Sequence, residues 1–70
     1  MKLYFQHANG HMTKIKDEVE ESNVWAAIVD DLRRRNPKFK VHYTRSWKDA
    51  KGWTWYDIGS WSEFYVMRDQ

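Results

Sequence analysis

Side chains able to carry out catalysis are few in this chain of 70 residues, which has three histidines and no cysteine. Asp57 and His42 could lie beside each other on paired strands and imitate a general base with its orienting group. A surface hydrogen bond is the simpler interpretation of that pair. There is no Gly-x-Ser-x-Gly elbow, and none of the glycines belongs to a phosphate-cradling loop. The sequence predicts a protein that is not an enzyme.

Two further histidines, His7 and His11, are expected to face each other at the end of a hairpin. Two imidazoles on a loop rim make an incomplete metal site, and without cysteine a thiolate zinc centre is excluded. We therefore predict no metal and no other cofactor.

The segment "RSWKDAKGWTWY" alternates basic and aromatic side chains, the combination that single-strand binders use for phosphate contacts and base stacking. A formal net charge of only +2 weakens this interpretation, as does the lack of an RNP-type or Gly-x-x-Gly motif. Single-stranded nucleic-acid or nucleotide binding is therefore the alternative function. Its candidate residues are Arg45, Trp47, Lys48, Lys51 and Trp53.

The composition is rich in aromatic residues, with five Trp, four Tyr and three Phe. A single domain spanning residues 1–70 is near the lower size at which a chain buries enough surface to fold alone, so a homodimer is expected. No apolar run approaches the roughly 20 residues that span a bilayer, and the first residues do not resemble a signal peptide. We expect a soluble, cytoplasmic protein that does not bind membranes.

The first element is a predicted hairpin, "KLYFQH-ANG-HMTKIK". A three-residue loop over residues 8–10, with Gly10 in the left-handed conformation, places Leu3 opposite Ile15 and Phe5 opposite Thr13. The other face of this hairpin then carries Tyr4, Gln6, Met12 and Lys14.

One amphipathic helix is predicted over roughly residues 22–36, with Ser22 or Asn23 as its N-cap and Pro37 after its end. Its buried stripe is Trp25, Ile28, Val29 and Leu32. The basic triplet at 33–35 complements the helix dipole and needs no nucleic acid to explain it.

Two strands are predicted next, over residues 38–48 and 53–58, joined by the turn "DAKG". The closing segment "YDIGSWSEFYVM" predicts a two-residue Gly59–Ser60 turn that pairs Trp55 with Phe64 and Tyr56 with Glu63. A short terminal helix over residues 61–67 is the alternative, because Ser60 and Glu63 match a capping box.

The predicted fold is α+β, an antiparallel sheet in ββαβββ order with the helix packed on one face. The predicted core is Leu3, Phe5, Ile15, Trp25, Ile28, Val29, Leu32, Phe39, Val41, Tyr43, Trp53, Trp55, Phe64 and Val66. Contiguous apolar residues on an uncovered sheet face mark an interaction site. The predicted partner-binding residues are Tyr4, Met12, Tyr56, Ile58, Trp61, Tyr65 and Met67.

The closing strand, with its Asp57-x-Gly59-Ser60-x-Ser62-x-Phe64 run, resembles small uncharacterised proteins encoded by phages and prophages of Gram-positive bacteria. The resemblance implies an accessory protein in the cytoplasm of the bacterial host that binds and inhibits or modulates a host or defence protein. We take this non-enzymatic protein–protein interaction as the first hypothesis and nucleic-acid binding as the second.

Overall fold

A computed structural model of the chain describes residues 1–41 and 45–69. Its elements follow in the order β1 (Lys2–Gln6), β2 (Met12–Lys16), a single 3₁₀ turn η1 (Glu21–Asn23), α1 (Val24–Arg35), β3 (Arg45–Lys48), β4 (Thr54–Asp57) and β5 (Phe64–Arg68). The predicted α+β class and ββαβββ order are confirmed.

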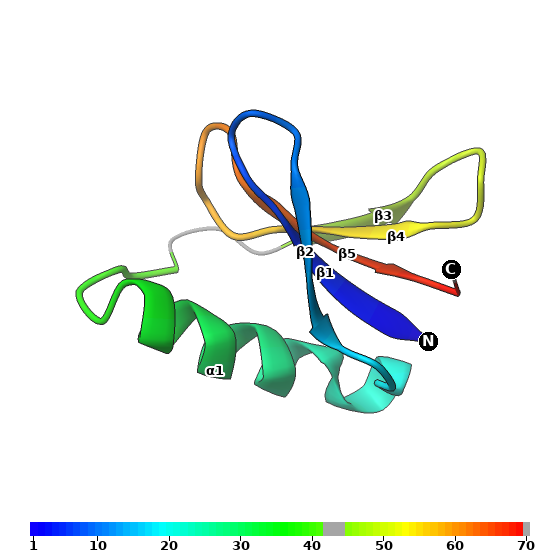
Figure 1. Cartoon of the computed structure of the whole chain (residues 1–70), viewed down its shortest axis with the longest axis horizontal. Coiled ribbons are helices and arrows are strands. Elements are labelled where there is room, and N and C mark those ends of the chain that lie inside the picture. The colour runs from blue at the N-terminus through cyan, green and yellow to red at the C-terminus, as the bar shows by residue number, and fades with distance from the viewer. Residues whose placement is uncertain (42–44, 70) are drawn as a thin grey trace.

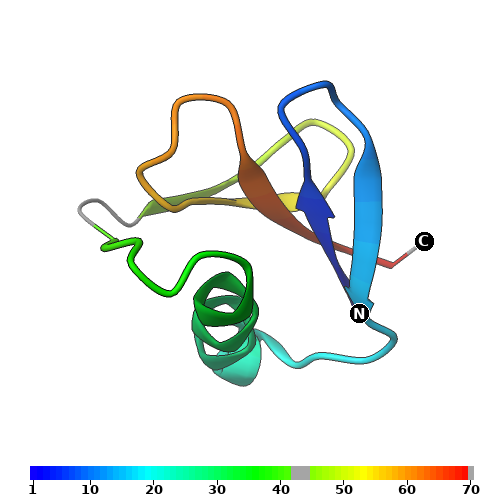
Figure 2. The same ribbon diagram turned by 60° about the vertical axis from the view of Figure 1, so that its left-hand side comes forward.

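The strands form one antiparallel sheet in the order β2-β1-β5-β4-β3, with α1 lying against one of its faces (Figure 1). The last strand is therefore central and pairs with both β1 and β4. The sheet is strongly twisted, so that the β1–β2 and β3–β4 hairpins run in different directions across the molecule (Figures 1 and 2).

The first hairpin has the predicted three-residue loop, in which Gly10 adopts a φ of 90°. Phe5 pairs with Thr13 as predicted. The pairing of Leu3 with Ile15 is wrong, because a bulge shifts the register and places Leu3 opposite Lys16. Ile15 is left partly buried against the core.

The helix is slightly shorter than predicted and begins after Asn23, whose side chain makes no capping hydrogen bond. Ile28 and Leu32 of the predicted stripe are buried, whereas Trp25 and Val29 lie partly exposed at its edge. Val24 and Asp31 complete the buried side of the helix. The stripe is thus rotated toward Val24, which is only 1% exposed.

The third strand is much shorter than the predicted one, since β3 begins at Arg45. Residues 38–41 lie in no strand or helix, and the predicted strand positions His42, Tyr43 and Thr44 lie outside the described residues. Phe39 packs partly against the core, while Val41 is 37% exposed.

The last connection differs most from the prediction. Asp57 pairs with Phe64 and Trp55 with Val66, so residues 58–63 form a six-residue loop and not a two-residue turn. Within that loop Gly59 has a φ of 86°, and its N–H donates to Asp57 Oδ1 at 2.8 Å. The alternative of a terminal helix is wrong, because β5 is a strand.

The two sides of the last hairpin are opposite to those predicted. The main cluster of buried residues includes Tyr56, Ile58, Tyr65 and Met67, which were predicted to lie on the uncovered face. Trp53, Trp55 and Phe64 were predicted core residues but are partly exposed on the other side. The reason is the pairing of β5 with β1: Leu3 pairs with Met67 and Phe5 with Tyr65, and residues directly opposite in an antiparallel pair share a face.

Asp31 brings a charged group into this core. Asp31 is 6% exposed, and its Oδ2 accepts hydrogen bonds from the hydroxyl of Tyr65 and from Nε of Arg35, both at 2.6 Å. Burial, followed by the bond to Asp31, raises the pKa of Tyr65 above its ordinary value. The helix is therefore joined to β5 by a buried polar contact as well as by apolar packing.

Candidate nucleic-acid interface

The sheet face opposite α1, here called the open face, carries most of the aromatic residues that the core does not take. Strand pairing aligns one row across it, because Trp47 pairs with Trp55, Trp55 with Val66, and Val66 with Tyr4. In the neighbouring row, Asp57 of β4 pairs with Arg45 of β3 on one side and with Phe64 of β5 on the other. Alternation along β4 sets Trp53 on the same face.

Three rings of the open face form a nearly equilateral cluster. The centroids of Trp47 and Trp55 lie 6.5 Å apart with their planes only 12° from parallel. Phe64 stands edge-on to both rings, 6.0 Å from Trp47 and 6.3 Å from Trp55. Trp53 extends the cluster, 6.5 Å from Trp55. The cluster is half-buried, and Trp47 at the sheet edge is 39% exposed.

Cationic groups lie over these rings. The guanidinium carbon of Arg45 is 5.2 Å from the Trp47 centroid, and Nζ of Lys51 is 4.7 Å from that of Trp53. The guanidinium of Arg68 lies over Trp53 at 4.6 Å. Each such contact stabilises by about 0.5–1 kcal/mol at an exposed site. These contacts also hold positive charge directly against the rings.

Asp49 fixes the position of the central indole. Its Oδ2 accepts a hydrogen bond from Nε1 of Trp55 at 2.9 Å, and its Oδ1 accepts from the backbone N–H groups of Lys51 and Trp53. These bonds, that of Trp55 first, hold the pKa of Asp49 below its usual range. The β3–β4 turn and the aromatic cluster therefore share one polar anchor.

Four of the five residues predicted for nucleic-acid binding, Arg45, Trp47, Lys51 and Trp53, belong to the open face or its edge. Lys48 is exposed but lies on the other face of the sheet. It pairs with Thr54, and Thr54 pairs with the buried Met67, so these three residues share the face that α1 covers. Trp55, Phe64 and Arg68 belong to the same surface but were not among the predicted binding residues. Their period-two alternation with Trp53 and Val66 was the available signal.

The residues predicted to bind a partner protein do not form one surface. Tyr56, Ile58, Tyr65 and Met67 are each at most 3% exposed, so their predicted exposure is wrong. Tyr4 and Met12 lie on the open face and are partly exposed. Trp61 is 100% exposed, as predicted, but it projects from the 58–63 loop and not from the sheet.

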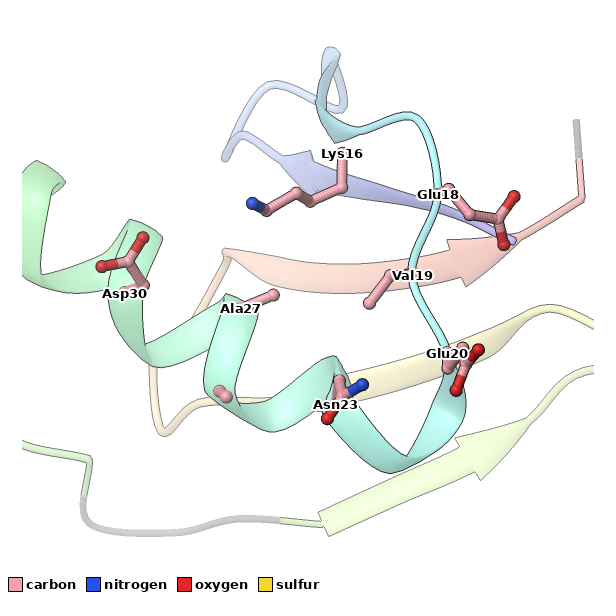
Figure 3. A pocket seen from close by; sticks show the side chains of 8 residues that line it. Lys16, Glu18, Val19, Glu20, Asn23, Ala27 and Asp30 are labelled. Atoms are coloured by element: carbon pink, nitrogen blue, oxygen red, sulfur yellow. The ribbon is translucent and has the colours of Figure 1, made fainter.

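A hollow of about 500 Å³ lies between residues 16–20 and the first half of α1 (Figure 3). In Figure 3 the carboxylates of Glu18 and Asp30 lie at opposite ends of it, so they do not form an acid–base pair. A second hollow, of about 280 Å³, is lined by Phe5, His7, Leu32, Arg35, Asn36, Phe39, Ile58 and Glu63.

The predicted histidine pair forms as expected at the hairpin end. The rings of His7 and His11 lie 5.6 Å apart, and Nε2 of His7 is 2.8 Å from the hydroxyl of Thr13. Among residues 1–41 and 45–69, no group of three or more His, Asp or Glu side chains is arranged to hold a metal ion. Across those same residues, no helix has the length and apolar character needed to cross a bilayer.

Comparison with known proteins gives no further guide to this surface, since no protein-family model, curated protein or solved structure matches the chain.

Proposed function

We propose that this protein binds single-stranded nucleic acid on its open face. The observation that carries the proposal is the joint placement of Trp47, Trp53, Trp55 and Phe64 with three cations, Arg45, Lys51 and Arg68, directly against the rings. No catalytic residue is assigned, and the protein acts as a binding module.

The ligand chemistry follows from what this surface can offer. The face of an indole ring can stack on an unpaired base, which stabilises the complex by about 1–3 kcal/mol per base. A duplex hides the faces of its bases, whereas a single strand presents them. The cations beside the rings are then positioned to meet the phosphates that link the stacked bases.

The charge of the protein limits the expected affinity. A formal net charge of +2 gives little long-range attraction, so binding depends on a few local contacts. For single strands the logarithm of the binding constant falls with the logarithm of salt with a slope of about −0.7 per phosphate contact. Three contacts, from Arg45, Lys51 and Arg68, predict a slope near −2.

The test is a titration of fluorescein-labelled single-stranded DNA and RNA at low salt, read by anisotropy. We expect Trp47→Ala to weaken binding about 5- to 150-fold, which corresponds to the loss of one stacked base. Trp61→Ala is the matched control, because it also removes an exposed indole but from outside the open face. No binding at low salt, or equal affinity for both variants, would refute the proposal.

A charge variant gives a second readout. Lys51→Gln should reduce the steepness of the salt dependence by about 0.7 while the fold is retained, since Lys51 is exposed. Lys38 is an exposed cation in the segment that follows α1. Lys38→Gln therefore serves as the control and should leave the slope of the salt dependence unchanged.

A second candidate function rests on Trp61. An indole that is 100% exposed between two serines is suited to enter a pocket of a partner protein, where Trp truncations commonly cost ~2 kcal/mol or more. This second candidate is the predicted phage-type inhibitor. Of the residues predicted to bind a partner protein, it retains only Trp61, which projects freely into solvent. Affinity capture from nuclease-treated bacterial lysate, with the parent chain and with Trp61→Ala, tests it. A partner retained equally by both chains would count against it.

A further inference from the structure

We propose that two copies of this chain pair through β3, antiparallel and centred on Trp47, so that the open faces of both copies form one continuous surface. This proposal does not rest on nucleic-acid binding and is tested without any ligand. The occupant of this sheet edge is a second copy of the chain.

The backbone of β3 determines which groups are free to pair. The strand is the outermost of the sheet, and all four of its residues are exposed. Asp49 N–H donates to the carbonyl oxygen of Trp53 at 2.9 Å, so this pair is of the hydrogen-bonded type. Because the pattern alternates along an antiparallel strand, Trp47 and Arg45 also direct their N–H and C=O groups toward β4. Ser46 and Lys48 direct theirs outward.

A twofold axis at Trp47 uses those outward groups fully. Ser46 then lies opposite Lys48 of the second copy, and each of these two symmetry-related pairs exchanges two hydrogen bonds, giving four in all. Trp47 lies opposite its own counterpart in a non-hydrogen-bonded pair, in which Cα atoms approach to about 4.5 Å. The side chains of the two indoles then meet on the same face.

Charge supports this register. Arg45 comes to lie opposite Asp49 of the second copy, so that opposite charges face each other across the new pair. The bonds that Asp49 accepts from Trp55, Trp53 and Lys51 keep it ionised, as its lowered pKa indicates. A register centred on Ser46 would instead place Arg45 opposite Trp47 and leave Asp49 without an opposite cation among the described residues.

The opposite edge of the sheet is less suited to pairing. β2 carries a register shift opposite Leu3–Tyr4, and an irregular edge with lysines is a common protection against strand addition. β3 pairs with β4 in continuous register and has no such shift. Of the two edges, β3 therefore presents the regular one.

Pairing at β3 would lengthen the aromatic row. The row Tyr4–Val66–Trp55–Trp47 would continue into Trp47, Trp55, Val66 and Tyr4 of the second copy. The second copy thus contributes an indole directly beside Trp47, and a ligand lying along the row would contact both chains.

Light scattering of the unmodified chain over a rising micromolar concentration series is the first measurement. We expect the mass to rise from the monomer value of 8.6 kDa toward twice that value. Ser46→Pro removes an outward N–H that β4 does not use, a substitution that an edge strand tolerates. Because both copies carry the substitution, two of the four hydrogen bonds between the copies are lost. The dissociation constant of the dimer should therefore rise about 5- to 150-fold. Ser46→Val, which keeps the N–H, should dimerise like the parent.

Single cysteines determine the register, because the chain has none of its own. Trp47→Cys should form an intermolecular disulfide under mild oxidation, since Cα atoms about 4.5 Å apart lie within the range that disulfides span. Ser46→Cys should not, because its counterpart is a diagonal neighbour about 7–8 Å away. A monomer at every concentration, dimerisation unaffected by Ser46→Pro, or crosslinking at position 46 in place of 47 would each overturn the proposal.

Discussion

The buried contact among Asp31, Tyr65 and Arg35 permits a quantitative prediction about what holds the helix to the sheet. Tyr65 is 0% exposed and Asp31 is 6% exposed, so water replaces neither partner when the other is removed. We consider two substitutions, Tyr65→Phe and Asp31→Ala, and their combination. The two residues are 34 positions apart, so their bond closes the tertiary structure and not a local turn.

The expected magnitudes follow from which groups lose a partner. Tyr65→Phe removes one hydrogen bond to a charged group, which lowers the free energy of unfolding by about 1.5–3 kcal/mol. Asp31→Ala leaves the buried hydroxyl of Tyr65 and the partly buried guanidinium of Arg35 without their acceptor. We therefore expect it to lower the free energy of unfolding by about 3–5 kcal/mol. Once Asp31 is absent, Tyr65→Phe should cost nothing or restore part of the lost stability, because it removes a buried hydroxyl that has no partner.

Urea unfolding followed by tryptophan fluorescence and by circular dichroism measures all four chains. The double-mutant cycle should give a coupling free energy of at least about 1.5 kcal/mol between Asp31 and Tyr65. Additive effects of the two substitutions, or a Tyr65→Phe chain within about 0.5 kcal/mol of the parent, would contradict the buried bond. Asp30→Ala, one residue earlier and exposed, is the control and should change stability little.

Three further predictions concern pH, exposure and the turn. The pKa of Tyr65 is raised in the folded state above its ordinary value of 10.0. The contribution of Tyr65 to folding stability is therefore complete below pH 10 and is lost as the pH rises above 10. Tyr65→Phe should flatten that alkaline decline in stability in a pH series of urea midpoints. Trp61→Ala should stay within about ±0.5 kcal/mol of the parent, whereas Ile28→Ala, at 0% exposed, should cost about 2–5 kcal/mol; equal losses would contradict the assigned burial. Gly10→Ala should lower stability by about 1–2 kcal/mol by thermal unfolding, because a Cβ is strained at a φ of 90° although space is open there; an unchanged midpoint would mean that the loop readjusts.

Local patterns in the sequence determined the elements and their order. The 3.6-residue period between residues 24 and 35 is enough to specify a helix, since it depends only on side-chain spacing. The loop at residues 8–10 and the turn at 49–52 were likewise predictable, because each has a glycine that adopts positive φ. The candidate site was predicted in part, since the basic and aromatic alternation around Trp47 and Trp53 is visible in the sequence.

The tertiary structure alone decided which side of the last hairpin is buried. Both sides are aromatic and apolar: Trp53, Trp55, Phe64 and Val66 lie on one, and Tyr56, Ile58, Tyr65 and Met67 on the other. A period of two separates these sets but cannot rank them, because both consist of large apolar and aromatic side chains. The choice is made by the pairing of β5 with β1, which sets Tyr65 beside Phe5, and by Asp31, which satisfies the Tyr65 hydroxyl from the helix. Both contacts join residues far apart in the chain, and for that reason no local pattern contains them.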